Sequence, residues 1–368
     1  MHEGKRLLVS TRKGLFVLER EGDAWRIARE AFLGDNVNLA LADPRDGSWY
    51  VALDLGHFGC KLQRSTDHGA SWRECAVPAY PEGAMANVGD GKPAQPATLK
   101  LVWALAAGGP REPGRLWAGT IPGGLFRSDD QGGSWQLVRP LWEHVERGGW
   151  FGGGYDWPGI HSVCVDPRDP RCIRVAVSTG GVWRSDDDGR TWQQTADGMR
   201  AEYMPPDRAM EPGVQDVHRM VQCRDQPRAL WAQHHNGIFR STTDGGDWRE
   251  IREAGPAVFG FAAAVHPADP DTAWFVPATK DEKRYPVGAA LVVTRTRDGG
   301  RTFDVLREGL PGEPSYDLVY RHALAIDDSG DRLAFGSTTG GLWTTHDQGD
   351  HWRMLPARLP PVLAVTFA

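Results

Sequence analysis

One eight-residue motif recurs along the chain and constrains its fold more than any other feature. Its clearest copy, residues 185–192, reads Ser-Asp-Asp-Asp-Gly-Arg-Thr-Trp, and a short apolar run that begins with Gly precedes it. Seven aromatic residues close the copies at intervals of 47 to 63 residues: Trp25, Trp72, Trp135, Trp192, Trp248, Phe303 and Trp352. Like units at a regular period predict one repeat architecture for the whole chain.

Each motif has the residues of a tight hairpin turn. Asp accepts hydrogen bonds from backbone N–H groups of the turn, Gly adopts a positive φ, and the closing Trp starts the return strand. A second turn, such as Asp-Pro-Arg-Asp-Pro at 166–170, lies upstream, so each unit has four strands. We therefore predict an all-β, seven-bladed β-propeller with four-stranded antiparallel blades.

The two ends of the chain are predicted to complete one blade. The first unit begins at the strand-like segment 6–10 and lacks an inner strand, whereas segment 361–367 has the character of an inner strand with no second strand after it. Residues 1–30 and 361–368 would together form blade 1, which closes the ring and removes exposed edges. The chain 1–368 is then a single domain with two long loop insertions, 141–158 and 199–215.

Composition narrows the class of protein. The sequence has no apolar run of about 18 residues and no signal-peptide pattern after Met1, so we expect a cytoplasmic protein with no membrane segment. A net charge of −6 argues against nucleic acid as the partner. The pairs Cys60/Cys75 and Cys164/Cys172 flank hairpin turns, but in a reducing compartment we expect buried thiols rather than disulfides.

The motif resembles that of the Asp-box, or BNR-repeat, propellers. This superfamily includes sialidases, other glycosidases and photosystem II assembly factors, and similar sequences are often labelled glycosyl hydrolases. The resemblance implies the fold, with the motif on the face opposite the usual binding site. Sialidases have six blades and an Arg-Ile-Pro segment, whereas this sequence has seven units and no such segment, so we predict that it is not a true sialidase.

Histidines are predicted to converge near the axis of the ring. Aligning the inner strands on their turns places five residues at equivalent positions: Asn38, His161, His218, Phe261 and His322. Neutral imidazoles from different strands are good ligands for a divalent transition metal, which His161, His218, His235 and His322 could hold; no organic cofactor is expected. Alternatively, these histidines are metal-free acids and bases, or each only forms a hydrogen bond at a blade junction.

Other polar and aromatic residues are predicted to lie on the same face. Candidate catalytic residues are His161, His218, His322, Asp216, Tyr203 and Asp156. Candidate substrate-binding residues are Arg219, Arg321, Lys100, His234, Trp150 and Tyr155. The basic groups would bind an anion, the aromatic rings could stack on a sugar, and the two insertions would cover the site as a lid.

These features favour a hydrolase or lyase of BNR-repeat type, acting on a small anionic or carbohydrate-like substrate in a histidine-rich pocket at one face. The alternative is a non-catalytic scaffold whose same face binds a protein partner. A catalytic pocket needs convergent polar groups in a closed concavity, whereas a scaffold needs an open patch with an apolar centre. The polar content of the two insertions favours the pocket.

Overall fold

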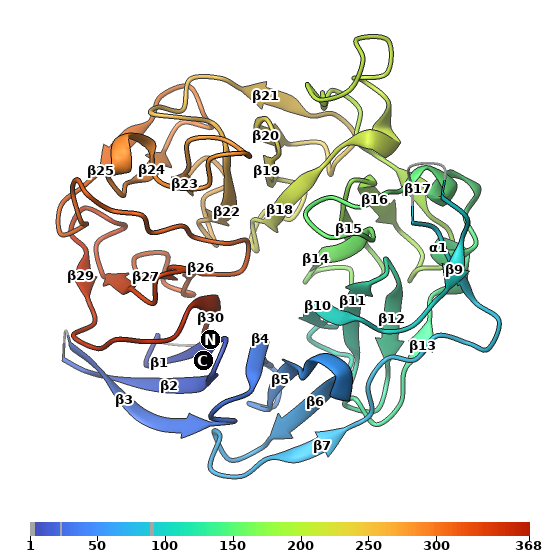
Figure 1. Ribbon diagram of the computed structural model, residues 1–368, viewed down its shortest axis with the longest axis horizontal. Coiled ribbons are helices and arrows are strands. Elements are labelled where there is room, and N and C mark those ends of the chain that lie inside the picture. The colour runs from blue at the N-terminus through green and yellow to red at the C-terminus, as the bar shows by residue number, and fades with distance from the viewer. Residues whose placement is uncertain (1–3, 23, 89–91) are drawn as a thin grey trace.

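The computed structural model describes residues 4–22, 24–88 and 92–368 of the chain. Seven four-stranded antiparallel sheets stand around a central axis, as Figure 1 shows, so the predicted seven-bladed propeller is confirmed. Helical segments are short: α1 (Arg139–Trp142), η1 (Gly56–Phe58), η2 (Val145–Gly149), η3 (Pro212–Val214) and η4 (Val287–Ala289). Within the described ranges, no helix has the length and hydropathy needed to cross a membrane.

Each blade runs from an inner strand beside the axis to an outer strand at the rim. Blade 1 contains β30 (Val362–Phe367), β1 (Arg6–Thr11), β2 (Gly14–Glu21) and β3 (Ala24–Ala31). Blade 2 contains β4 (Asn36–Ala42), β5 (Trp49–Asp54), β6 (Cys60–Ser65) and β7 (Arg73–Cys75). Blade 3 contains β10 (Leu101–Ala107), β11 (Leu116–Ile121), β12 (Leu125–Ser128) and β13 (Gln136–Leu137). Blade 4 contains β14 (Gly159–Val165), β15 (Ile173–Ser178), β16 (Gly181–Ser185) and β17 (Gln193–Gln194).

The remaining three blades repeat this order. Blade 5 contains β18 (Val217–Gln222), β19 (Leu230–His234), β20 (Gly237–Ser241) and β21 (Arg249–Ile251). Blade 6 contains β22 (Gly260–Val265), β23 (Ala273–Pro277), β24 (Val293–Thr296) and β25 (Asp304–Leu306). Blade 7 contains β26 (Leu324–Ile326), β27 (Leu333–Gly336), β28 (Leu342–Thr345) and β29 (Arg353–Met354). A small extra hairpin joins β8 (Met85–Ala86) to β9 (Gln95–Pro96).

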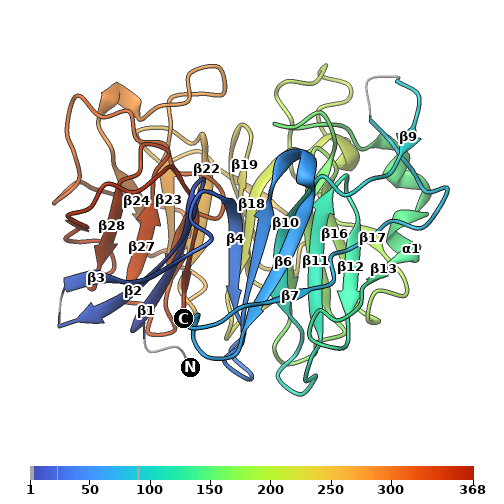
Figure 2. The ribbon, with the colours of Figure 1, turned by 60° about the horizontal axis from the view of Figure 1, so that its bottom comes forward.

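The last strand of the chain closes the ring. β30 pairs antiparallel with β1, with Phe367 opposite Leu7 and Val365 opposite Val9. The C-terminal segment therefore supplies the inner strand of blade 1, as predicted; residues 1–3 of that predicted blade lie outside the described residues. Figure 2 shows that β30 ends and β1 begins near one face of the ring, whereas longer loops rise from the opposite face.

The repeated motif forms the turn between the third and fourth strands of a blade. In blade 4 the Asp187 carboxylate accepts hydrogen bonds from the Thr191 N–H (2.9 Å) and the hydroxyls of Thr191 (2.7 Å) and Ser185 (2.9 Å). The Ser185 Oγ accepts a bond from the N–H of Gly189, which has a φ of 78°. These bonds lower the pKa of Asp187 to about 2. The hydrogen bonds within the motif therefore stabilise the hairpin turn.

Apolar clusters fill the space between neighbouring blades. Trp117 of blade 3 packs in one cluster with Ile160, Val175 and Trp183 of blade 4. Six large indoles from six blades are almost fully buried: Trp49, Trp117, Trp183, Trp231, Trp274 and Trp343. Burying side chains of this size stabilises each blade junction, because each removes a large apolar area from water. All five cysteines are free thiols, of which only Cys223 is fully buried.

Bulges in the inner strands determine what faces the axis. Six inner strands shift register at the same level, which leaves one or two residues outside the hydrogen-bonded ladder. The residues at these bulges, in chain order, are Asn38, Trp103, His161, His218, Phe261 and Leu363. In blade 7, His322 lies just before β26 and bridges to Ala364 of β30. A β-bulge reorients the side chain that it carries, and we refer to these seven residues as the bulge ring.

Candidate functional site

A cavity of about 570 Å³ lies on the axis at one face of the propeller. All members of the bulge ring except His161 line it. Its wall also includes loops between second and third strands, which carry Arg12 and Arg284, and connections between successive blades, which carry Tyr155 and Arg321. This is the face on which the sequence placed the site.

One wall of the cavity brings together a carboxylate and two imidazoles. Asp216 precedes β18, His218 occupies the bulge of that strand, and His235 follows the paired strand β19. The Asp216 Oδ2 lies 3.3 Å from the His235 Nδ1 and 3.7 Å from the His218 Nε2. We call these three residues the acid–imidazole cluster. Pairing of β18 with β19 places residues close in sequence around one carboxylate.

The protonation of His218 follows from its other contact. Its Nδ1 lies 2.7 Å from the carbonyl oxygen of Gly260, which can only accept, so Nδ1 carries the hydrogen. Burial lowers the pKa of His218 despite the opposing charge of Asp216, so the ring is neutral near pH 7. Its Nε2 faces the Asp216 carboxylate.

The other two members of the cluster carry shifted pKa values as well. Burial alone would raise the pKa of Asp216, but His218, His235 and Arg321 outweigh burial and hold that pKa well below its usual range. Burial would lower the pKa of His235, but the hydrogen bond and charge of Asp216 reverse the effect and raise it. The cluster therefore keeps an ionised carboxylate in a buried position.

Arg321 places a buried positive charge on the same cavity. The residue is 8% exposed, and its guanidinium carbon lies 4.9 Å from the ring centre of Trp103 and 5.4 Å from that of Phe261. Among the residues that the structure describes, no carboxylate forms an ion pair with it, and burial lowers its pKa. The charge of Asp216 acts on this guanidinium but is not in contact with it, so its N–H groups are suited to bind an anion.

The first insertion reaches the cavity, whereas the second contacts the acid–imidazole cluster without lining the cavity. Tyr155 of segment 141–158 lines the cavity and packs edge-on against Trp103, with ring centres 5.1 Å apart. Gly153 lies so close to the acid–imidazole cluster that a Cβ there would be 3.1 Å from the Asp216 Oδ2. Tyr203 of segment 199–215 packs edge-on against His235 at 4.9 Å and donates its hydroxyl hydrogen to the Val214 carbonyl. Each insertion therefore contacts the cluster.

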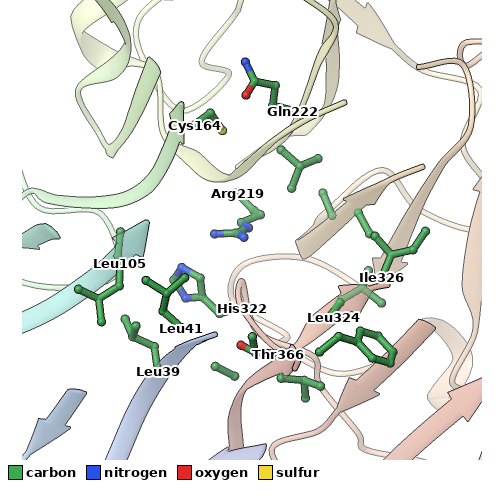
Figure 3. A pocket seen from close by; sticks show the side chains of 18 of the residues that line it. Leu39, Leu41, Leu105, Cys164, Arg219, Gln222, His322, Leu324, Ile326 and Thr366 are labelled. Atoms are coloured by element: carbon green, nitrogen blue, oxygen red, sulfur yellow. The ribbon is translucent and has the colours of Figure 1, made fainter. Parts of the chain in front are cut away.

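Two predicted site residues lie at the opposite end of the axis. Arg219 and His161 line a second cavity of about 480 Å³ with largely apolar walls, and Figure 3 shows Arg219 there with His322 nearby. Arg219 follows its bulge residue, whereas Arg321 precedes His322. Because the inner strands run the same way around the ring, the two arginines point toward opposite ends. Arg219 is therefore not a substrate-binding residue of the first cavity.

Four further predicted residues lie outside the first cavity. His234 packs on Phe239 with ring centres 5.1 Å apart, and burial lowers its pKa to about 3. Trp150 is fully buried against Trp183, so it belongs to the core. The Lys100 ammonium lies 5.1 Å from the ring centre of Trp157, and Asp156 is exposed on the insertion. None of these four is among the residues that line the cavity.

His161 and His322 do not join the acid–imidazole cluster. The His161 Nδ1 lies 3.0 Å from the Ser162 Oγ, and burial lowers the pKa of this histidine well below its usual range. The His322 Nε2 lies 2.8 Å from the His161 carbonyl oxygen, so Nε2 donates there and is not available as a metal ligand. Of the four histidines predicted as metal ligands, only His218 and His235 therefore lie together, and Asp216 lies with them.

Trp103 and Arg284 also line the cavity; Trp103 was missed from sequence, whereas Arg284 belongs to the turn 280–285 that the sequence places on this face. Blade 3 lacks the Asp-Pro turn on which the inner strands were aligned, so Trp103 could not be matched to the other members of the bulge ring. Its position two residues after the start of an apolar strand was the available signal. Arg284 lies in a loop whose conformation no local pattern fixes.

Comparisons with known proteins relate the chain to carbohydrate-acting hydrolases. No family model matches it. It is 26% identical over 314 residues to a xyloglucanase of Paenibacillus sp, which covers 76% of this chain and 28% of that protein. A xyloglucanase of Acetivibrio thermocellus is 23% identical over 270 residues, covering 65% and 29%. The chain thus spans less than a third of the length of these curated relatives.

Solved structures share the fold at low sequence identity. The GH74 xyloglucanase of Xanthomonas campestris matches with a TM-score of 0.63 and 18% identity, over 95% of this chain and 52% of that one. A structure of YCF48 bound to D1 peptide matches with a TM-score of 0.54 and 15% identity, over 95% and 89%. The chain is therefore a seven-bladed propeller similar to xyloglucanases and to YCF48 propellers.

Proposed function

We propose that this protein is a hydrolase or lyase that acts on a small anionic, carbohydrate-like substrate in the first cavity. The observation that carries the proposal is the shared wall: an unpaired buried guanidinium, Arg321, lies in the same cavity as the acid–imidazole cluster. Similarity to xyloglucanases supports a carbohydrate as the substrate class. The cavity volume of about 570 Å³ is within the range of small-ligand sites.

Arg321 is the residue that we assign to recognition of the anion. Its planar guanidinium can donate two parallel hydrogen bonds to a carboxylate, as in a uronic acid. Arg284 also lines the cavity, but it is already paired with Asp281 at 2.5 Å, so it has less charge to offer a ligand. Trp103 and Tyr155 present rings beside Arg321 and can pack against the apolar face of a sugar.

The acid–imidazole cluster is the group that we assign to the reaction. A carboxylate and two imidazoles on one wall can activate a water molecule for hydrolysis or a substrate C–H bond for elimination. Both reactions need a substrate held at a fixed place, which Arg321 provides beside the cluster. The polar character of this wall favours a catalytic pocket over an apolar docking patch.

The test compares anionic with neutral sugars. Aryl galacturonides, aryl glucuronides and oligogalacturonides would be assayed beside the matching neutral glycosides, with hydrolysis followed by released reducing ends and elimination by ultraviolet absorbance of the unsaturated product. We expect turnover of the anionic set alone, and we expect Arg321→Met to lower kcat/KM by about 100-fold or more.

Arg219→Met is the matched control, because it removes a second guanidinium on the axis but at the opposite end. It should leave kcat/KM unchanged. Turnover of neutral xyloglucan fragments in place of the anionic sugars would overturn the assignment of Arg321. Absence of any turnover, together with tight binding of a peptide at this face, would favour the scaffold instead.

A further inference from the structure

We infer that Asp216, His218 and His235 form a binding site for one divalent transition-metal ion, of the zinc class, in the wall of the first cavity. The ligand set is one carboxylate oxygen and two imidazole nitrogens, which suits Zn²⁺ and related first-row ions. The role of this metal in turnover rests on the proposed function, whereas its binding does not.

The spacing of the three side chains fits a single ion. One ligand atom from each residue lies within 4.8 Å of the other two. The two distances to the Asp216 Oδ2 are 3.3 and 3.7 Å. Ligands about 2.0–2.1 Å from a tetrahedral zinc ion are about 3.4 Å apart, so these two pairs already have the needed separation. Only the two imidazoles must approach, and their ring centres are 5.5 Å apart.

The hydrogen bond of His218 to Gly260 prepares its other nitrogen for a metal. Because Nδ1–H donates to a carbonyl oxygen, Nε2 is the ring nitrogen left for a ligand, and a carboxylate oxygen lies 3.7 Å from it. A cation bound between these two atoms would contact both of them. Metal-ligating histidines typically donate their second ring N–H in this way, which fixes the tautomer and the ring orientation.

Asp216 has an unused ligand atom as well. Its residue is 6% exposed, and its Oδ1 is buried without a hydrogen-bond partner in the described part of the chain. A buried carboxylate oxygen left without a partner is costly, and coordination of one cation through both carboxylate oxygens would remove that cost. Three protein ligands leave at least one position for water or substrate, and His235 is the partly exposed member that borders the open cavity.

The test is direct metal binding to the tag-free full chain. After removal of metals by a chelator, Zn²⁺ and Co²⁺ would be titrated by calorimetry, and the visible ligand-field spectrum of Co²⁺ would report the coordination. We expect one ion per chain with a tetrahedral-type spectrum. Asp216→Asn and His218→Gln should each weaken binding by about 100-fold or more, because each removes a ligand atom.

His161→Gln is the matched control, since His161 occupies the equivalent bulge in the neighbouring blade but lies outside the cluster. This variant should bind Co²⁺ with an unchanged spectrum. Circular dichroism and the unfolding midpoint of every variant would separate loss of a ligand from loss of the fold. Failure of the wild-type chain to bind Co²⁺, or binding that survives in the Asp216→Asn/His218→Gln double variant, would overturn the inference.

The outcome is separable from that of the proposed function. Stoichiometric metal without turnover of uronic sugars would keep the metal site and refute the substrate class. Turnover of those sugars that persists after complete removal of metal would keep the substrate class and refute a role for the metal in turnover, whereas the Co²⁺ titration alone decides whether the site binds metal.

Discussion

Arg321→Met should affect stability and ligand binding in opposite directions. Methionine has a similar length but no charge, so the change removes a guanidinium that is 8% exposed and has no carboxylate partner among the described residues. Taking such an ion out of water costs several kcal/mol. The two ring contacts, at 4.9 and 5.4 Å, return about 0.5–2 kcal/mol each. The charge of Asp216 also favours the guanidinium, so we expect the free energy of unfolding to rise by about 1 kcal/mol in the absence of ligand.

The same substitution should weaken binding of an anionic sugar. Two charge-assisted hydrogen bonds would be lost, and a loss of about 3 kcal/mol corresponds to a factor near 100 in Kd. Urea unfolding followed by tryptophan fluorescence would measure the stability, and calorimetry with a uronic acid would measure the affinity. Arg321→Lys tests the planar fork specifically, because it keeps the charge but not the geometry.

Two results would refute this reasoning. A loss of unfolding free energy above about 2 kcal/mol in Arg321→Met would show that the guanidinium is a structural element of the wall rather than an unsatisfied charge. Unchanged affinity for the anionic sugar would show that the ligand charge is held elsewhere.

Three further predictions concern the frame of the propeller. The pKa of Asp187 in the folded protein, about 2, is below its value in the unfolded chain. Its contribution to the free energy of unfolding is therefore complete above about pH 4 and is lost as the pH falls toward 2. Urea midpoints measured from pH 6 to 2 should fall less in Asp187→Asn than in wild type. Val365→Asp should lower the free energy of unfolding by about 3 kcal/mol or more, because this 4% exposed side chain lies in the strand that closes the ring. Leu363→Asp should lower it much less, because the Leu363 side chain faces the first cavity. Equal losses in the two variants would contradict the directions in which these two side chains point. Without reductant, a thiol reagent should count five thiols in the unfolded chain, with Cys223 the last to react in the folded protein; a count of three or one would reveal disulfides.

The fold could be predicted because its signals are local. The turn motif is held by bonds within eight residues, such as those from Ser185 and Thr191 to Asp187, so the sequence pattern alone defines each hairpin. Counting the hairpins gives the number of blades, and the unmatched apolar segment at the C-terminus then has one place to pair. Once the hairpins and the number of blades are known, the apolar faces that pack between neighbouring blades are determined as well.

The candidate site could be predicted only in part. How far along the axis a side chain lies depends on the bulges in the inner strands. The acid–imidazole cluster comes from two paired strands of one blade, so Asp216, His218 and His235 were all among the candidates. His161 and His322 share the level of His218, yet their side chains turn to other partners, which no spacing reveals. Arg219 and Arg321 differ only in lying after or before their histidine, and the direction of the strands could have told them apart.

The bulge ring also bears on how such proteins diverge. Its side chains lie outside the hydrogen-bonded ladders, so a substitution at Leu363 changes the lining of the cavity while the backbone pairing of the blade stays as it is. A lineage can therefore alter the ligand chemistry of the cavity through a few single-residue changes in the bulge ring. The turn motif would not change in such steps. It therefore indicates the fold and carries little information about the reaction.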